Sequence, residues 1–391
     1  MSIRKCACSS EAFLKLKYIY EHREEEAAKW RRLGKKVVGE LGSDVPDEIL
    51  IGGGMLPIRV YAEPDKPLTE TDRYLEYAFD PVVRAQFEKI VDGTYASQID
   101  ALAVSNSTDV LIRTYLYLRE LKRVEPQKAV PEVACIDWLF TRNYLYQTRN
   151  EGTIERFWKE TEQWAGHAVT DEDIRKGAAI CNENRQALRR MAELRHGSEV
   201  RINGSEALVI IGSAFFTDRE THTALVNQVT EDSGSWPVIR GPRIFVSGSN
   251  QEDTQLYDLI ESAGAVIVGE DHDWGDRFYE RDYNMDFDPV RAIVDRYMLR
   301  EFSSKKAFVS QRVEALDCMA DAVAAEGVIF YTNIYEEAAS WDYPSQKKSL
   351  ESRGIKTLNC VKMQWPVSKN EQLEAKIQSF VSGMKGDEQD V

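Results

Sequence analysis

Residues 243–268 read RIFVSGSNQEDTQLYDLIESAGAVIV, and they carry the clearest fold signal in the chain. An apolar run at 243–246 leads through a polar turn into a helical pattern over 252–263. Gly264 ends this pattern, and a second apolar run follows at 265–268. A strand, a helix and a strand in this order predict two parallel strands joined by a crossover helix.

The same alternation continues on both sides of this unit. Further strand-like runs occur at 56–61, 101–104, 134–137, 327–330 and 355–358. Helical patterns occur at 45–50, 81–92, 110–121, 153–162, 171–194, from Pro289 onward, at 343–353 and at 371–384. We therefore expect an α/β protein with two doubly wound parallel-sheet (Rossmann-like) domains plus an N-terminal helical segment. Ligands of such folds bind at the carboxyl ends of the strands.

Composition also suggests where the chain divides. Residues 195–240 combine several glycines with polar residues, so we place the boundary between the two α/β domains there. This gives an N-terminal helical arm at 1–40, a first α/β domain at 41–195 and a second α/β domain at 196–391.

The helical pattern of the arm runs over 11–41, unless residues 37–40 form a short strand that ends it early. Its charges change from acidic to basic along the chain, which suits the helix dipole. A solvated arm is the simpler interpretation, but one side is apolar and offers a surface for a partner. That side consists of Phe13, Leu14, Leu16, Tyr18 and Ile19.

The overall charge excludes several classes of function. The 391 residues include 50 lysines and arginines and 65 aspartates and glutamates, so the net charge is −15. This excess repels phosphate backbones and anionic lipid, and we expect neither a nucleic-acid nor a membrane partner. The start of the chain lacks the apolar core of a signal peptide, and no apolar run reaches the roughly 18 residues of a membrane span. We expect a cytoplasmic protein with reduced cysteines.

Familiar catalytic motifs are absent from the sequence. It contains no GxSxG, HExxH or GxGxxG, and the glycines at 52–54 lack the ending of a phosphate-binding loop. Gly248 and Ser249 are better placed, because they join a predicted strand to a helix. Their backbone N–H groups could hold an anion, or the turn could simply cap the helix.

Two further polar segments contain candidate site residues. Residues 271–277 place three aspartates around His272, which could bind a metal or tune an acid–base pair. A polar loop with an aspartate–arginine pair at Arg277, and an exposed histidine, is the plainer alternative. Arg142 and Asn143 could bind a substrate carboxylate, the arginine bidentately, or tie down a loop.

Short segments along most of the chain occur in the order found in one enzyme family. These segments are 34–39, 45–50, 54–59, 80–84, 107–109, 243–249, 260–265, 326–330, Pro344 and 354–355. Together they resemble the subunits of the 2-hydroxyacyl-CoA dehydratase and benzoyl-CoA reductase family. The resemblance implies an enzyme subunit that acts on a CoA thioester beside a homologous second subunit, as a heterodimer or heterotetramer.

The resemblance also bears on the cofactor. Members of this family hold a [4Fe–4S] cluster through three cysteines, which correspond here to Asp80, Thr108 and either Tyr335 or Glu336. None of these residues can supply a thiolate, so we expect the cluster to be absent. We expect no metal and no cofactor other than the CoA of the substrate. The former ligand positions would then line a polar cavity together with Asp109.

Cluster-less members of the family imply a particular reaction. They are associated with the benzylsuccinate pathway of anaerobic toluene degradation, and there the resemblance implies a mutase. Such an enzyme moves CoA between the two carboxyls of a 2-(hydroxy(phenyl)methyl)succinyl-CoA-type substrate. Our candidate catalytic residues are Glu336, Asp109 and His272. Our candidate substrate-binding residues are Asp80, Thr108, Arg142, Asn143, Gly248, Ser249, Arg277 and Tyr335.

Two alternatives remain open from the sequence. The chain could be a non-catalytic subunit that completes a heterodimer. It could also be a dehydratase subunit whose iron–sulfur cluster is held by other cysteines, for example Cys135 with Cys318.

Overall fold

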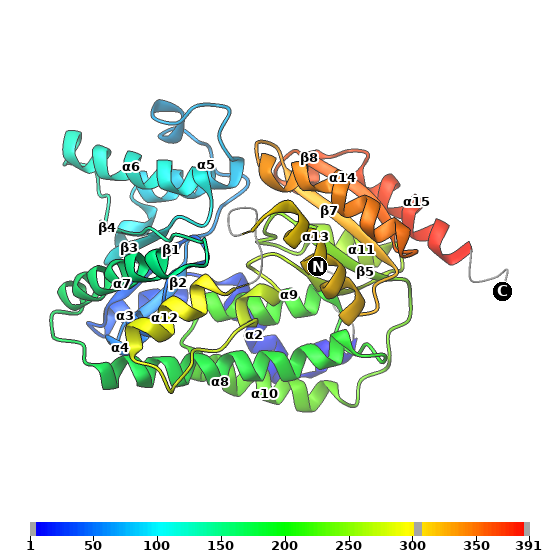
Figure 1. Ribbon diagram of the computed structural model, residues 1–391, viewed down its shortest axis with the longest axis horizontal. Helices are drawn as coiled ribbons and strands as arrows, with labels where there is room; N and C mark the ends of the chain where they lie inside the picture. The colour runs from blue at the N-terminus through cyan, green and yellow to red at the C-terminus, as the bar shows by residue number, and fades with distance from the viewer. Residues whose placement is uncertain (1–4, 301–306, 387–391) are drawn as a thin grey trace.

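The computed structural model of the protein describes residues 5–300 and 307–386. These residues include two four-stranded sheets, with strand orders β2-β1-β3-β4 and β6-β5-β7-β8. Every strand pair in both sheets is parallel. Figure 1 shows the first sheet and its helices on the left and the second sheet on the right. The expected doubly wound α/β fold is thereby confirmed.

The first sheet is buried on both faces. Its strands are β1 (Val37–Leu41), β2 (Leu56–Arg59), β3 (Ala101–Ser105) and β4 (Glu132–Ile136). Its helices are α4 (Asp47–Gly52), α5 (Pro81–Val91), α6 (Asp109–Val124) and α7 (Tyr144–Ala165). Val37 and Val38 are neighbours in β1 but belong to different hydrophobic clusters, one on each side of the sheet. Helices on both faces explain why the strands read as continuous apolar runs.

The second sheet repeats this arrangement. Its strands are β5 (Arg243–Gly248), β6 (Val266–Glu270), β7 (Gly327–Asn333) and β8 (Lys356–Met363). Its helices are α11 (Gln255–Ser262), α13 (Val309–Ala322), α14 (Glu337–Ser352) and α15 (Leu373–Gly386). The unit β5–α11–β6 is the strand–helix–strand segment that the sequence predicts at 243–268.

The start of helix α14 differs from the prediction. We expected the helix to open at Pro344, but it begins at Glu337 and contains Pro344 in its interior. Tertiary contacts hold the turns before the proline. Arg312 pairs with Asp342 at 2.6 Å, and the ring of Tyr343 packs against a ring in β7. These contacts outweigh the hydrogen bond that a proline removes from a helix.

A layer of helices lies beneath both sheets. It includes α8 (Asp171–His196), α9 (Gly204–Ser213), α10 (Arg219–Ser233) and α12 (Pro289–Met298). Helix α8 contacts α4 of the first sheet and β6 of the second, and Figure 1 shows it running under both. The glycine-rich segment 195–240 contains α9, all of whose residues are buried. A Cβ at Gly204 would lie 2.5 Å from Ile267 Cβ, so glycine permits the close approach of α9 to β6.

The N-terminal region is not one long helix. It forms α1 (Lys5–Ser9), α2 (Glu11–Glu21) and α3 (Glu25–Arg32) before β1 begins at Val37. A helix over 11–41 is therefore wrong, and the alternative of a strand near 37–40 is correct. The paired β-branched residues at 37 and 38 favour a strand, and Gly34 ends the preceding turn with a φ of 73°.

The apolar side of the arm packs inside the chain. Phe13 and Leu16 are fully buried in the same hydrophobic cluster as residues of α9 and α10. Leu14 and Tyr18 remain exposed. The interpretation as a solvated arm is therefore wrong for these buried residues, and the alternative of a partner surface is wrong for them too, because α9 and α10 already cover them.

The long helices are amphipathic. Helix α8 spans 26 residues, and charged and polar side chains interrupt its apolar positions. Over the described residues, no helix combines the length and the apolar character needed to cross a membrane.

Candidate functional site

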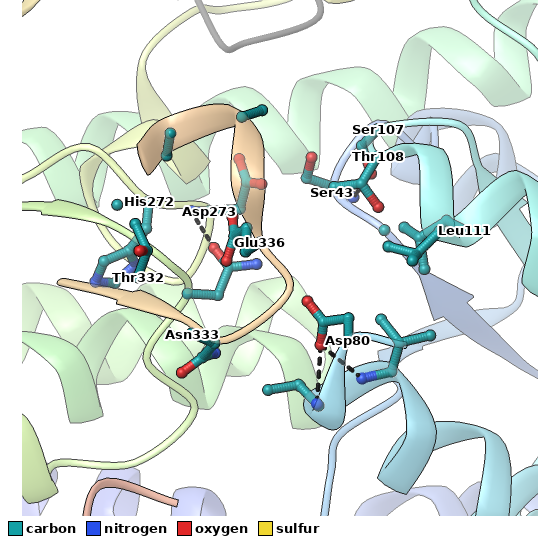
Figure 2. Close-up of a pocket in the computed structure, with 18 of the residues that line it drawn as sticks. Ser43, Asp80, Ser107, Thr108, Leu111, His272, Asp273, Thr332, Asn333 and Glu336 are labelled. Atoms are coloured by element: carbon teal, nitrogen blue, oxygen red, sulfur yellow. Dashed lines mark hydrogen bonds between the residues drawn. The ribbon is translucent and has the colours of Figure 1, made fainter. Parts of the chain in front are cut away.

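The carboxyl ends of the two sheets border a cavity of about 790 Å³. Ser43, Ser107 and Thr108 line it from the loops that follow β1 and β3, and Asp80 lines it from the start of α5. The opposite wall comes from the loops that follow β5, β6 and β7. Figure 2 shows the two sets facing one another, with Glu336 on the second side. This is the place where open α/β sheets bind ligands.

Most of the candidate residues from the sequence lie at this cavity. Those that line it are Asp80, Thr108, Asp109, Gly248, His272, Arg277, Tyr335 and Glu336. Ser249 is buried and contacts Glu336. Five separate loops or helix starts contribute these residues, so the fold assembles a site that is scattered through the sequence.

Arg142 and Asn143 lie elsewhere and do not belong to the cavity lining. The side chain of Asn143 caps α7 by accepting a hydrogen bond from Tyr146 N at 2.9 Å. Arg142 Nη2 lies 3.5 Å from the carbonyl oxygen of Arg300. The structure thus shows the alternative in which these two residues tie down a loop, and their predicted role in binding a carboxylate has no support from their position.

Glu336 is oriented by a short chain of hydrogen bonds. The backbone N–H of Asn333, at the end of β7, donates to Ser249 Oγ at 2.8 Å. Ser249 Oγ in turn donates to Glu336 Oε2. Because the serine oxygen already accepts the backbone hydrogen bond, its own proton is available for the carboxyl group.

The environment of Glu336 shifts its proton affinity. Burial, followed by the negative charge of Asp80, raises the pKa of Glu336 to about 7, and the hydrogen bond from Ser249 acts in the opposite direction. A carboxyl group that titrates near neutral pH is suited to acid–base or nucleophilic chemistry. Strongly shifted groups in clefts are also frequent at functional sites.

Tyr335 precedes this carboxyl group in a constrained conformation. Its φ is 70°, in the left-handed region that residues other than glycine rarely adopt. Its ring packs edge-on against Tyr77, with 6.4 Å between centroids. This contact joins the loop after β7 to the first half of the protein. Backbone strain of this kind is concentrated at functional sites.

Asp80 has both a capping role and a place in the cavity. Asp80 Oδ1 accepts hydrogen bonds from Val82 N at 2.8 Å and Val83 N at 3.1 Å, which caps α5. Pro81 occupies the first turn, where its missing N–H costs nothing. Burial raises the pKa of Asp80, and the two backbone hydrogen bonds oppose this shift. Asp80 and Glu336 therefore share a site in which two negative charges are unfavourable.

His272 is buried, so the expectation of an exposed histidine is wrong. Its Nε2 lies 2.9 Å from the hydroxyl of Tyr257, which also donates to Glu270 Oε2 at 3.0 Å. In that arrangement Nε2–H donates to Tyr257, and Nδ1 is left as an acceptor without a hydrogen-bond partner among the described residues. Burial lowers the pKa of His272, which favours the neutral ring.

The backbone of the turn after β5 is already engaged. Gly248 N donates to Asp271 Oδ1 at 2.9 Å, and Ser249 N donates to the carbonyl oxygen of Tyr331 at 2.8 Å. Neither of these two N–H groups is therefore left to hold an anion, which was one of the two alternatives for this turn. A Cβ at Gly248 would lie 2.2 Å from Tyr331 O, so the glycine allows β5 and β7 to approach closely.

The acidic loop after β6 forms ion pairs. Asp273 lies 3.5 Å from Arg277 Nε and 3.8 Å from Arg300 Nη2. This matches the plainer of the two interpretations, an aspartate–arginine pair in a polar loop. Over the described residues, no group of three or more histidine, cysteine, aspartate or glutamate side chains could hold a metal ion.

The residues that the resemblance assigns to the cluster positions do not fit an iron–sulfur cluster. Asp80, Thr108 and the pair Tyr335–Glu336 border one cavity, as the resemblance implies, but they offer carboxylate, hydroxyl and phenol oxygens. Iron–sulfur clusters are held mainly by thiolates. Among the residues the structure describes, no cysteine lines this cavity. Cys135 lies in β4 and Cys318 is exposed on α13, so the alternative ligand pair gains no support.

Sequence reasoning missed several polar residues of the cavity, among them Arg59, Gln86 and Glu252. Glu252 Oε2 accepts from Ala62 N at 2.7 Å, and its Oε1 accepts from Gln86 Nε2 at 2.8 Å. Its side chain therefore joins the two halves of the protein. Burial raises the pKa of Glu252 to about 7. The sequence placed Arg59 inside a predicted strand at 56–61, and nothing there marked it as a cavity residue.

The fold and the cavity together define a class of protein, in which two parallel α/β sheets bind a ligand between their carboxyl ends. The chain belongs to the family of the 2-hydroxyglutaryl-CoA dehydratase D-component, whose family model matches residues 43–383.

Three curated proteins illustrate this relationship. The chain is 22% identical to the (R)-phenyllactyl-CoA dehydratase beta subunit of Clostridium sporogenes, over 93% of this chain and 94% of that protein. It is 21% identical to (R)-2-hydroxyglutaryl-CoA dehydratase subunit beta of Acidaminococcus fermentans, over 84% and 87%. It is also 21% identical to lactoyl-CoA dehydratase subunit beta of Anaerotignum propionicum, over 89% and 91%.

Proposed function

We propose that this chain is one subunit of a heteromeric enzyme that acts on an acyl-CoA thioester without an iron–sulfur cluster. Its reaction is the transfer of CoA between the two carboxyls of a substituted succinyl group, of the 2-(hydroxy(phenyl)methyl)succinyl-CoA type. The family and its named relatives support the CoA thioester and the multi-subunit assembly. The homologous partner follows from the same resemblance.

One observation carries the reaction type. A position that would hold a cluster ligand is occupied by Glu336, a carboxyl group with a pKa of about 7 that Ser249 orients in the cavity. Transfer of CoA within one molecule needs groups that donate or accept protons and that stabilise developing negative charge, but it needs no electron. The donor set of the cavity therefore suits this reaction better than a reductive one.

The bond changes balance within the substrate. The free carboxylate attacks the thioester carbonyl, so a C–O bond forms and the C–S bond breaks. The products are a cyclic five-membered anhydride and the CoA thiolate. The thiolate then attacks the other carbonyl, a new C–S bond forms, and the ring C–O bond breaks to release a carboxylate. Holding the two carboxyl carbons in place is a proximity effect, which contributes several kcal/mol.

Glu336 has two roles open to it in this sequence. In its neutral form it donates a hydrogen bond to the carbonyl oxygen or to the departing thiolate, where negative charge develops. In its ionised form it attacks the thioester and forms a mixed anhydride, from which the substrate carboxylate displaces it. Both forms are populated near neutral pH, because the pKa of Glu336 is about 7.

The relatives favour a second candidate, the dehydration of a 2-hydroxyacyl-CoA, because the three reported above are dehydratase subunits. In this family, that reaction depends on an electron from the cluster. The polar oxygen donors at Asp80, Thr108 and Glu336 count against it.

The test uses the chain co-expressed with its homologous partner and purified without oxygen. We expect conversion of the substituted succinyl-CoA to its isomer with no reductant or ATP added, and far less than one iron per complex. Conversion that requires a low-potential reductant, together with several irons bound to this chain, would support the dehydratase instead. If Glu336→Gln leaves the rate unchanged while the partner's variants abolish it, the chain is a non-catalytic subunit.

A further inference from the structure

One arginine of the cavity has no ion-pair partner among the residues that the structure describes. Three other arginines line the cavity and pair with carboxylates of this chain: Arg113 with Glu76 at 3.9 Å, Arg277 with Asp273 at 3.5 Å, and Arg312 with Asp342 at 2.6 Å. Arg59, the last residue of β2, forms no ion pair and no side-chain hydrogen bond within residues 5–300 and 307–386. It is only 7% exposed.

An aromatic ring fixes the position of this guanidinium. The Cζ atom of Arg59 lies 4.1 Å from the centre of the Phe215 ring. Phe215 packs edgewise against Trp274, a further residue of the cavity, with 5.0 Å between ring centres. Stacking covers one face of the guanidinium and leaves its N–H edge free for hydrogen bonds in its own plane.

The nearby acidic groups do not neutralise Arg59 by contact. Asp47 pairs with Arg219 at 2.6 Å. Burial, followed by the neighbouring Asp47, raises the pKa of Glu40 well above its usual value, so the ionised form of Glu40 is disfavoured. A buried cation without a contact partner is unfavourable unless a ligand supplies the opposite charge. The guanidinium fork matches a carboxylate bidentately.

We propose that Arg59 binds the free carboxylate of the acyl group and so selects a dicarboxylic acyl-CoA over a monocarboxylic one. This inference rests on the proposed function for the CoA thioester, but it does not depend on the transfer reaction. The source of the anion is the acyl group and not a phosphate of CoA. Arg59 is buried against Phe215 in the wall of the cavity, and this buried position suits a small carboxylate better than a hydrated phosphate ester.

Binding experiments on the complete heteromeric complex test this directly. Succinyl-CoA and butyryl-CoA are the probes, because they have the same number of acyl carbons and differ by a carboxylate in place of a methyl group. We expect the wild type to bind succinyl-CoA about 10- to 100-fold more tightly, as a charge-assisted bidentate pair allows. Arg59→Gln should remove most of this preference by weakening the binding of succinyl-CoA, while the binding of butyryl-CoA stays unchanged. Arg59→Lys should retain part of the preference.

Control variants separate the charge of Arg59 from its packing and from the other cations of the cavity. Arg113→Gln, at an exposed arginine of the same cavity, should leave the preference unchanged. Arg59→Met keeps an unbranched stem against Phe215, so it tests the loss of charge if Arg59→Gln folds poorly. Equal losses for both acyl-CoAs and for free CoA would show that Arg59 binds a phosphate, which overturns the inference. An unchanged preference in a folded Arg59→Gln complex would also overturn it.

Failure of this inference about Arg59 can be distinguished from failure of the proposed CoA-transfer function. If the preference depends on Arg59 but the complex never moves CoA between carboxyls, the inference stands and the transfer reaction fails. If Arg59→Gln moves CoA with an unchanged KM, the transfer reaction stands and the inference fails.

Discussion

The hydroxyl group of Ser249 donates a hydrogen bond to the carboxyl group of Glu336. Ser249 follows β5 and Glu336 follows β7, so two adjacent parallel strands build this contact at their carboxyl ends. The backbone N–H of Asn333 donates to the oxygen of Ser249, so the serine proton points toward Glu336. A carboxyl group held in this way, with a pKa of about 7, is the central chemical feature of the cavity.

Replacement of Glu336 should remove the proposed acid or nucleophile. We expect Glu336→Gln to lower the rate of CoA transfer by at least about 100-fold, the scale of general acid–base catalysis. Initial rates followed by chromatography of the CoA esters measure the effect. Glu371→Gln is a control, because Glu371 is an exposed carboxylate outside the cavity lining and should change the rate less than about 2-fold. Equal losses in both variants would contradict the assignment.

Replacement of Ser249 should move the pH dependence. The hydrogen bond from Ser249 lowers the pKa of Glu336, so its loss in Ser249→Ala should raise that pKa further. The corresponding limb of the pH–rate profile should shift upward by about 0.5–1 pH unit, because a hydrogen bond contributes about 1 kcal/mol. Ser249→Thr keeps the hydroxyl group and should restore the profile. A downward shift in Ser249→Ala would be incompatible with this role.

Folding stability should decrease as the pH rises toward 8. The pKa values of Glu252 and Glu261 are raised to about 7 in the folded protein by burial, from about 4.5 when unfolded. Between these values the folded state binds more protons, so the stabilisation is fully present below pH 4.5 and is lost as the pH rises through 7. We expect the Tm to be higher at pH 5.5 than at pH 8.

A variant identifies the group responsible for this change. Glu252→Gln cannot ionise, so the difference in Tm between pH 5.5 and pH 8 should become smaller. Calorimetry of the variant and the wild type at both pH values measures this. The acidic groups with lowered pKa values, such as Asp47 at about 2, titrate below this window and do not interfere. An unchanged pH dependence would contradict the assignment to Glu252.

The close approach of β5 to β7 should make Gly248 sensitive to substitution. Its φ is 127°, and a Cβ there would lie 2.2 Å from the carbonyl oxygen of Tyr331. We expect Gly248→Ala to lower the free energy of unfolding by about 2–4 kcal/mol. Gly383→Ala is the control, since a Cβ meets no atom within 4 Å at that helical position. It should be neutral or slightly stabilising, because alanine favours helices. Denaturant titration compares the two.

The sequence predicted the sheets because their strands are short apolar runs between helical patterns. The family resemblance also implied that Asp80, Thr108 and Glu336 would line one cavity, and the structure places all three at the same cavity. The starts of helices were harder to predict. Tertiary contacts extend α14 ahead of Pro344, and this information is absent from local propensity.

Long-range contacts explain what the sequence did not reveal. Glu252 meets Ala62, 190 positions away, and nothing near either residue marks this contact. In the sequence Arg59 is one residue of a predicted strand, and only the structure shows that it lines the cavity and pairs with no described carboxylate. Arg142 was a candidate because an arginine can bind a carboxylate bidentately, but it lies outside the cavity lining.

The most direct measurement follows the thioester itself. A substituted succinyl-CoA labelled with ¹³C at the thioester carbon is incubated with the complex and observed by NMR, without reductant. The account predicts that the labelled carbon changes from a thioester to a carboxylate signal while the total thioester is conserved. Loss of the hydroxyl group as water with the label still in the thioester, or no change unless a reductant is added, would contradict it.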